Sequence, residues 1–285
     1  MLFKLKIKGL FEGISIKDLL LLLIFPTIIT LLMLLPDSVR ISMMLNVKNP
    51  QWWQFFTSGF MHQDLAHLTN NLIWYFLLVF PLFFLIATKT IKKKYYFQFF
   101  IFIIITFPIV SSFFVVHYYP EIFPNLMYST GSSGIIAAFS GLIPSFWILS
   151  IANKDKIRIK RRFALINIFY LILSFLIIYF PIHRKLFLSS LIGILFVIFL
   201  FSYSKGFLNI LKKIGFEQQK NIISAFISLF TIILFVFTPI LFFPKINLLN
   251  NNGTLTDFLV HYLGIAYGLI ISFYFFIFAH KETKS

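Results

Sequence analysis

The stretch YYFQFFIFIIITFPIVSSFFVVHY, residues 95–118, contains no Asp, Glu, Lys or Arg. A helix that crosses a bilayer needs about 20 mostly apolar residues, and this stretch provides them. Seven further stretches meet the same condition, so the sequence predicts an all-α, polytopic transmembrane helical bundle with about eight spans. The predicted spans are 18–36, 66–88, 95–118, 132–152, 163–181, 186–204, 222–243 and 257–279.

The composition of the whole chain agrees with a membrane protein. Of its 285 residues, 59% are hydrophobic, 20% are aromatic and only 12% are charged. Soluble domains are about 25% charged, so this chain has too little polar surface to face water. There is no cysteine, which excludes disulfides and thiolate chemistry.

The formal net charge of +16 would suggest a nucleic-acid partner in a soluble protein. If the N-terminus is placed inside, however, 20 of the 25 Lys and Arg residues fall in five short inner segments. This asymmetry follows the positive-inside rule and predicts a multi-pass protein of the cell membrane with both termini in the cytoplasm. The charge is therefore explained by the lipid bilayer, and we expect no nucleic-acid partner.

The first residues resemble a signal peptide, because lysines precede an apolar run from Leu19 to Leu35. That run is long enough to span, and no small-x-small cleavage site follows it, so we interpret it as the first transmembrane helix. The predicted organisation is a cytoplasmic N-terminal segment, 1–17, followed by a single membrane domain, 18–285.

Polar side chains in three predicted spans lie at a common depth. Asn71, Ser133 and His261 are each 18 to 21 residues from a basic residue at the inner end of the span. At a rise of 1.5 Å per residue, all three lie about 27–31 Å above the inner surface, near the outer edge of the hydrocarbon layer. His67 is one turn above Asn71 on the same face. Polar groups inside spans are costly and suggest a functional site.

Small residues on two of these spans predict a close helix–helix contact. The stripe on 132–152 consists of Ser133, Ala137, Ser140 and Gly141, and on 257–279 Gly264 and Gly268 share a face with His261. Such stripes let membrane helices approach closely, which would bring the Ser133 hydroxyl to the imidazole of His261. Ser132 falls on a bulkier face, so Ser133 is the preferred nucleophile. From the residues alone, packing and catalysis remain equally open interpretations.

Three motifs resemble those of the rhomboid family of intramembrane serine proteases. Gly131-Ser132-Ser133-Gly134 is similar to Gly-x-Ser-Gly, and His261-Tyr262-Leu263-Gly264 with Gly268 is similar to His-x-x-Gly-x-x-x-Gly. His62, His67 and Asn71 are similar to His-x4-His-x3-Asn. The resemblance covers about 18–152 and 222–279 and implies a rhomboid-like core of six helices.

The resemblance implies a serine-type endopeptidase that cleaves transmembrane segments of membrane proteins near the outer face. Ser133 would be the nucleophile and His261 its general base, while His67 and Asn71 would donate hydrogen bonds to the oxyanion, with the backbone N–H of Ser133. His62 would be a structural residue of the first outer loop. Neither a cofactor nor a metal is implied.

The sequence departs from the family pattern in three places. Gln54 replaces the arginine of a Trp-Arg pair that holds the first outer loop. Ala137 stands where many members carry an aromatic residue against the base, and Tyr262 or Phe139 is a candidate to fill that space. Three predicted spans, instead of one, separate the nucleophile from the base, and we assign 163–204 as an inserted helix pair.

The same residues bear on three competing classes of membrane protein and on an inactive relative. A membrane metalloprotease would need His-Glu-x-x-His, and an aspartyl protease would need two carboxylates inside spans; neither occurs. The spans also lack the interior charges of a proton-coupled transporter, although a channel or transporter for neutral solutes stays open. Asp257 is expected to cap a helix and not to complete a triad. The main alternative is an inactive rhomboid-like protein that binds or escorts membrane helices.

Overall fold

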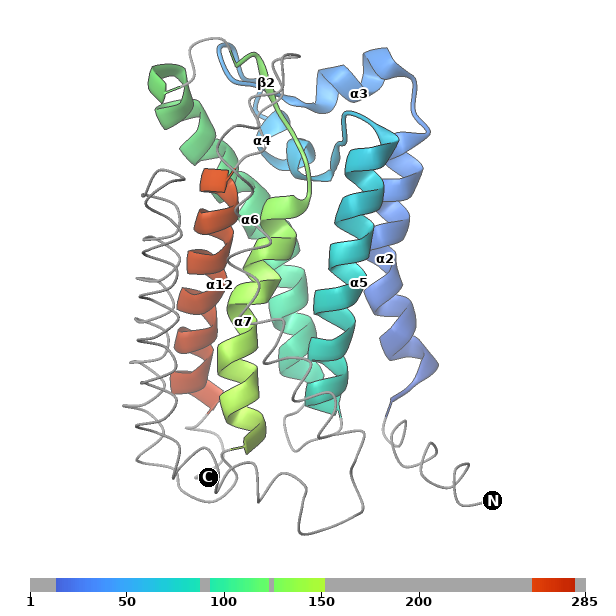
Figure 1. Cartoon of the computed structure of the whole chain (residues 1–285), viewed down its shortest axis with the longest axis vertical. Helices are drawn as coiled ribbons and strands as arrows, with labels where there is room; N and C mark the ends of the chain where they lie inside the picture. The colour runs from blue at the N-terminus through green and yellow to red at the C-terminus, as the bar shows by residue number, and fades with distance from the viewer. Residues whose placement is uncertain (1–13, 88–92, 123–125, 152–257, 280–285) are drawn as a thin grey trace, which may run out of the picture.

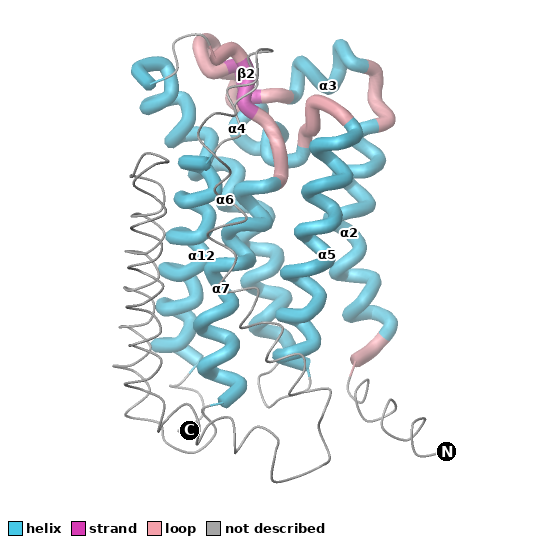
Figure 2. The backbone as a smooth tube through the Cα atoms, viewed as in Figure 1, coloured by secondary structure: helices cyan, strands magenta, loops and turns pink. Residues whose placement is uncertain are grey.

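The computed structural model describes residues 14–87, 93–122, 126–151 and 258–279. Long helices dominate these ranges and run side by side along the molecule (Figure 1, Figure 2). They are α2 (Ile16–Met33), α5 (Leu65–Ala87), α6 (Lys93–Ile122), α7 (Ser133–Ile151) and α12 (Phe258–Ala279). These helices correspond to five of the eight predicted spans. The predicted spans 163–181, 186–204 and 222–243, and with them the inserted pair 163–204, lie outside the described residues.

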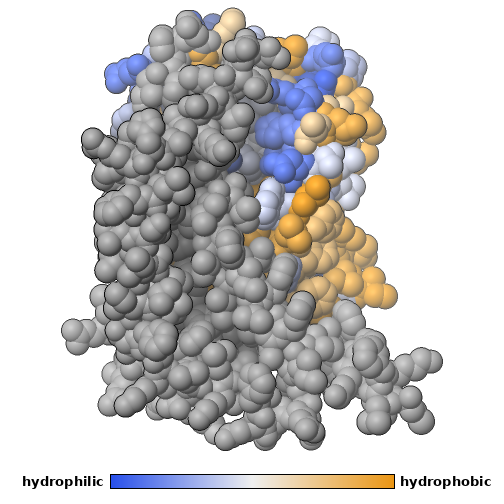
Figure 3. Space-filling view, in the orientation of Figure 1, coloured by the Kyte–Doolittle hydropathy of each residue, from blue (hydrophilic) through white to orange (hydrophobic). Residues whose placement is uncertain are grey.

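Three of the described helices are long and apolar enough to cross a membrane, and they cover Ile16–Met33, Leu65–Phe84 and Tyr96–Glu121. Large hydrophobic side chains on them are exposed, for example Ile101 on α6 and Ile73 on α5. Hydrophobic residues cover much of the lower part of the described surface, and hydrophilic residues gather higher up (Figure 3). Exposed apolar faces of this extent are what lipid contact requires.

The start of α2 shows why the first span begins where it does. The Ser15 hydroxyl accepts a hydrogen bond from the backbone N–H of Asp18 at 3.2 Å, and the Asp18 carboxylate accepts one from the N–H of Ser15 at 2.8 Å. This reciprocal capping box satisfies two N–H groups at the helix start. The helix therefore begins two residues before the predicted boundary.

The segment between α2 and α5 is folded into short elements at one end of the bundle. They are α3 (Asp37–Met43), β1 (Leu45–Asn46), α4 (Gln54–Thr57) and the 3-10 helix η1 (Ser58–Phe60). Strand β1 pairs antiparallel with β2 (Tyr128–Ser129), which lies just before α7. The segment between α2 and α5 is thus attached to the chain that leads into Gly131-Ser132-Ser133-Gly134.

Helices α7 and α12 pack backbone to backbone. A Cβ atom added at Gly268 would lie 2.0 Å from the carbonyl oxygen of Ala138, and one added at Gly264 would lie 2.4 Å from that of Gly134. Only glycine fits such a separation, because any side chain would overlap the facing backbone. The close contact predicted from the small-residue stripes is therefore present. Helix α7 also packs against α5 and α6, which makes it the centre of the described bundle.

Candidate active site

The register of α7 and α12 sets the relative positions of Ser133 and His261. A Cβ atom on Gly134 would lie 2.5 Å from Cγ1 of Val260, and Gly264 faces the carbonyl of Gly134. The residue after Ser133 thus faces the residue before His261. The two helices run parallel, so Ser133 and His261 lie at the same level, within the first turns of their helices.

The two side chains differ in exposure. Ser133 is the first residue of α7 and is half-buried, whereas His261 is buried, including its Nε2 atom. Within the described ranges, no hydrogen bond joins the Ser133 hydroxyl to the His261 ring. Such bonds are commonly long in proteases without substrate and shorten when substrate binds. The arrangement brings the pair to one level at the start of the two helices.

His67 lies directly against the Gly131 position of the motif. A Cβ atom on Gly131 would lie 2.8 Å from Cε1 of the His67 ring. Gly131 also has a φ of 122°, a backbone conformation that residues other than glycine rarely adopt. Its N–H donates a hydrogen bond to the carbonyl of Ser58 at 3.1 Å, which holds the loop before α7 against η1. Glycine is required here both for the turn and for the contact with His67.

Asn71 belongs to a buried cluster of three polar side chains. Nε2 of His62 lies 2.9 Å from Nδ2 of Asn71 and 3.1 Å from Oγ of Ser132. The exposed fractions are 2% for His62, 2% for Asn71 and 0% for Ser132. The His67 ring lies edge-on to that of His62, with 5.1 Å between centroids. Hydrogen bonds of this kind are what make burial of polar groups tolerable.

The protonation state of His62 follows from its surroundings. Burial, together with the neighbouring His67, lowers the pKa of His62 from 6.5 to about 3. The imidazole is therefore neutral at pH 7, with one nitrogen carrying a proton and the other accepting hydrogen bonds. With the amide nitrogen of Asn71 as donor, the acceptor is Nε2.

The sequence does not predict this cluster. Helical spacing puts Ser132 on a bulky face of its helix, which agrees with its complete burial but gives no indication of its bond to His62. The family resemblance implies a structural role for His62, and its ring has two hydrogen-bond partners, Asn71 and Ser132. The available signal was that a buried histidine and a buried serine each need a hydrogen-bond partner.

Gln54 anchors the loop between α2 and α5 through its side-chain amide. Its Oε1 accepts hydrogen bonds from the N–H groups of Asn46 at 3.1 Å and Gln51 at 3.0 Å, and its Nε2 donates to the carbonyl of Ser42 at 3.0 Å. The side chain is buried, with 5% exposed. A neutral amide thus joins three parts of the loop between α2 and α5 at the position where the family pattern has arginine.

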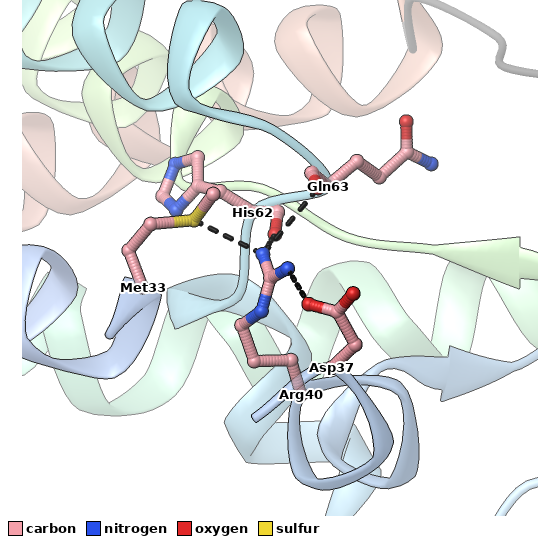
Figure 4. A network of polar contacts seen from close by, with 5 residues as sticks. All are labelled: Met33, Asp37, Arg40, His62 and Gln63. Carbon is pink, nitrogen blue, oxygen red and sulfur yellow. Dashed lines mark hydrogen bonds and ion pairs between the residues drawn. The ribbon is translucent and has the colours of Figure 1, made fainter. Parts of the chain in front are cut away.

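Arg40 also stabilises the loop between α2 and α5 by bonding to its backbone (Figure 4). Nη1 of Arg40, on α3, donates to the carbonyls of His62 at 3.1 Å and Gln63 at 3.4 Å, and lies 3.1 Å from Sδ of Met33. Nη2 forms an ion pair with the exposed Asp37. Arg40 therefore holds the backbone that carries the His62 ring.

The space beside Ala137 is filled by helix α12. Ala137 is fully buried, and its Cβ lies 3.0 Å from where a Cβ on Gly264 would be. There is no room for an aromatic side chain at this separation. Phe139 packs against Phe100 on α6, with 5.3 Å between ring centroids, so it faces away from α12. Tyr262 is half-buried.

A small polar-lined cavity opens next to the site. Its lining includes His67, Tyr119 at the far end of α6, and Tyr128 and Thr130 from the chain before α7. In the parts of the chain that the structure describes, no group of three or more His, Asp or Glu side chains could hold a metal ion.

Comparison with protein-family models identifies the family. The family model described as Rhomboid domain matches residues 49–206, which is more than half of the chain. The matched range contains His67, Asn71 and Ser133 and ends before His261. It also includes 163–204, so the assignment of that segment as an insertion stays a prediction. A search of curated proteins and a search of solved structures each found no match. With its apolar spanning helices and a match of this extent, the chain is a membrane-embedded, multi-pass protein that belongs to the rhomboid family.

Proposed function

We propose that this protein is an intramembrane serine endopeptidase that uses Ser133 and His261 as a catalytic dyad. The rhomboid family consists in general of intramembrane serine proteases that act on transmembrane substrates. The observation that carries the proposal for this chain is the register of α7 and α12, in which Gly134 faces Val260 and brings Ser133 level with His261.

The proposed reaction begins with attack of the Ser133 hydroxyl on a backbone carbonyl. A serine hydroxyl is a weak nucleophile until a base takes its proton, and His261 is that base. The protonated His261 then gives the proton to the leaving amine, which releases the first product and leaves an acyl ester on Ser133. Attack by water on this ester, with His261 again as base, completes hydrolysis.

Stabilisation of the oxyanion is assigned to Asn71 and His67, together with the backbone N–H of Ser133. The contacts that support this role tie both α5 residues to the start of α7: His67 lies against Gly131, and Asn71 reaches Ser132 through His62. Hydrogen-bond donors held in fixed positions stabilise an oxyanion strongly where water is excluded. The loss of one such donor typically lowers the rate by a factor of about 10²–10³.

The proposed substrate is a transmembrane segment that unwinds near the outer face. An intact helix holds its carbonyls in internal hydrogen bonds, so a segment with small or helix-breaking residues presents its backbone more readily. We place both termini of the protease in the cytoplasm on the charge bias of the sequence. The accessibility of a tag at each end, in intact cells, tests this orientation.

The test is cleavage of a single-span substrate in liposomes by wild type, Ser133→Ala and His261→Ala. Wild type should cleave and both variants should not, and a fluorophosphonate should label wild type but not Ser133→Ala. Ser112→Ala is a matched control, because Ser112 is a buried serine whose hydroxyl bonds to that of Ser58 at 3.1 Å. Equal cleavage by wild type and Ser133→Ala would refute the mechanism.

The second candidate is an inactive relative that binds membrane helices. It is compatible with the family match, which ends at residue 206 and so does not reach His261. Such a protein would bind the single-span substrate without cleaving it and would not react with a fluorophosphonate. The labelling experiment therefore separates the two candidates directly.

A further inference from the structure

The proposed oxyanion donor Asn71 is held by a residue to which the proposed mechanism gives no role. The amide nitrogen of Asn71 lies 2.9 Å from Nε2 of His62, and the same Nε2 lies 3.1 Å from the Ser132 hydroxyl. His62 comes from the loop before α5, Asn71 from α5 itself, and Ser132 from the residue just before α7. One imidazole nitrogen thus connects three separate parts of the chain.

Ser132 is covalently adjacent to the proposed nucleophile. Its hydroxyl therefore joins His62 to the peptide that supplies the N–H of Ser133. The amide of Asn71 bonds to the same nitrogen. The cluster therefore connects this amide, on α5, to the residue just before α7. All three side chains are buried, so water does not compete for these bonds, which makes the geometry stiffer than at an exposed site.

The backbone of His62 is held as well. The guanidinium of Arg40 donates to the carbonyl of His62 at 3.1 Å and to that of Gln63 at 3.4 Å (Figure 4). Asp37 pairs with the other side of this guanidinium. His62 is therefore restrained at its main chain by Arg40 and at its ring by Asn71 and Ser132.

We propose that His62 and Ser132 are positioning residues that hold the amide of Asn71 in place relative to Ser133, with Arg40 supporting the main chain of His62. The inference rests on the proposed function, because it assigns Asn71 to the oxyanion. Oxyanion donors act only when they point at the charge that develops, and a displacement of about 1 Å can cost about 100-fold in rate.

The test is a double-variant cycle on the full-length protein in liposomes with a single-span substrate. Ser132→Ala, Asn71→Ala and the double variant are compared with wild type for kcat, KM and thermal unfolding. We expect kcat of Ser132→Ala to fall about fivefold to tenfold, the effect of roughly one hydrogen bond, while KM changes by less than about twofold. In the Asn71→Ala background the same change should alter kcat by less than about twofold, because no amide remains to be positioned.

A merely structural role gives a different pattern. Ser112→Ala removes a buried serine bond of the same 3.1 Å length outside the cluster and should leave kcat unchanged. If Ser132→Ala lowers the unfolding temperature but not kcat, or lowers kcat by the same factor with and without Asn71, the positioning role is wrong. If Ser132→Ala does not fold, His62→Gln is measured in the same cycle, with the same expectations.

The failure of this inference is distinct from the failure of the proposed function. Absence of cleavage and of fluorophosphonate labelling in wild type would overturn both. An unchanged kcat in Asn71→Ala would remove Asn71 from the oxyanion site, and the positioning role with it, while leaving the Ser133–His261 dyad intact.

Discussion

Gly264→Ala tests the close approach of α7 and α12, on which the proposed dyad depends. The added Cβ would lie 2.4 Å from the carbonyl oxygen of Gly134, about 1 Å short of an ordinary contact of 3.4 Å. The obstructing atom belongs to the backbone of α7 and cannot rotate away. The two helices must therefore separate by about 1 Å near Ser133 and His261.

The expected cost has a structural and a catalytic part. Inserting a methyl group into a well-packed contact typically costs about 1–3 kcal/mol of stability. A displacement of about 1 Å between nucleophile and base typically lowers the rate about 100-fold. We therefore expect a modest fall in the unfolding temperature and a fall in kcat of about 100-fold, larger than the loss of stability explains.

The assay is kcat on a single-span substrate, with thermal unfolding measured on the same preparation. Ile270→Ala is the control, because Ile270 lies on the exposed face of α12 and its truncation should change neither quantity by much. A folded Gly264→Ala variant with the kcat of wild type would contradict the register of α7 and α12 described above.

Three further variants test the fold around the site. Gln54→Leu removes three hydrogen bonds of the first outer loop and should lower stability by about 2 kcal/mol, measured by thermal unfolding, whereas the exposed Trp52→Ala should have no such effect. Tyr267→Phe removes the 2.6 Å bond to Thr106 that joins α12 to α6 and should cost only about 0.6 kcal/mol in the same measurement. The pKa of His62 is lowered to about 3 by burial, so below pH 6.5 the unfolded chain binds a proton that the native chain does not. Stability should therefore fall toward pH 3, by up to about 1.4 kcal/mol per pH unit, and the unfolding temperature of His62→Gln should fall less than that of wild type between about pH 7.5 and about pH 5.

The hydropathy of the sequence predicted the described helices well. The boundaries of α5, α7 and α12 lie within one residue of the predicted spans, because an apolar run of about 20 residues has few other stable forms. Helix α6 extends further than predicted, from Lys93 to Ile122. Lys and Glu residues lie at its ends. They fall outside a span defined by hydropathy, but they can still be part of the helix.

The candidate residues were also found from sequence, because depth in the membrane follows from counting residues along a helix. Small-residue periodicity predicted the contact of α7 with α12, and the motif resemblance supplied the roles that remain proposals. Hydropathy and residue spacing are local properties of the chain, so they can be read without a structure.

Only the tertiary structure decided which polar groups hold the site together. His62 bonds to Ser132 across 70 residues of sequence, and Arg40 reaches the carbonyl of His62 across 22. The sequence likewise showed that Gln54 departs from the family pattern, but not that its amide satisfies two N–H groups and a carbonyl of the first outer loop. Hydrogen bonds depend on distances of a few tenths of an ångström and on direction, and these are set by how distant elements pack and not by the order of residues along them.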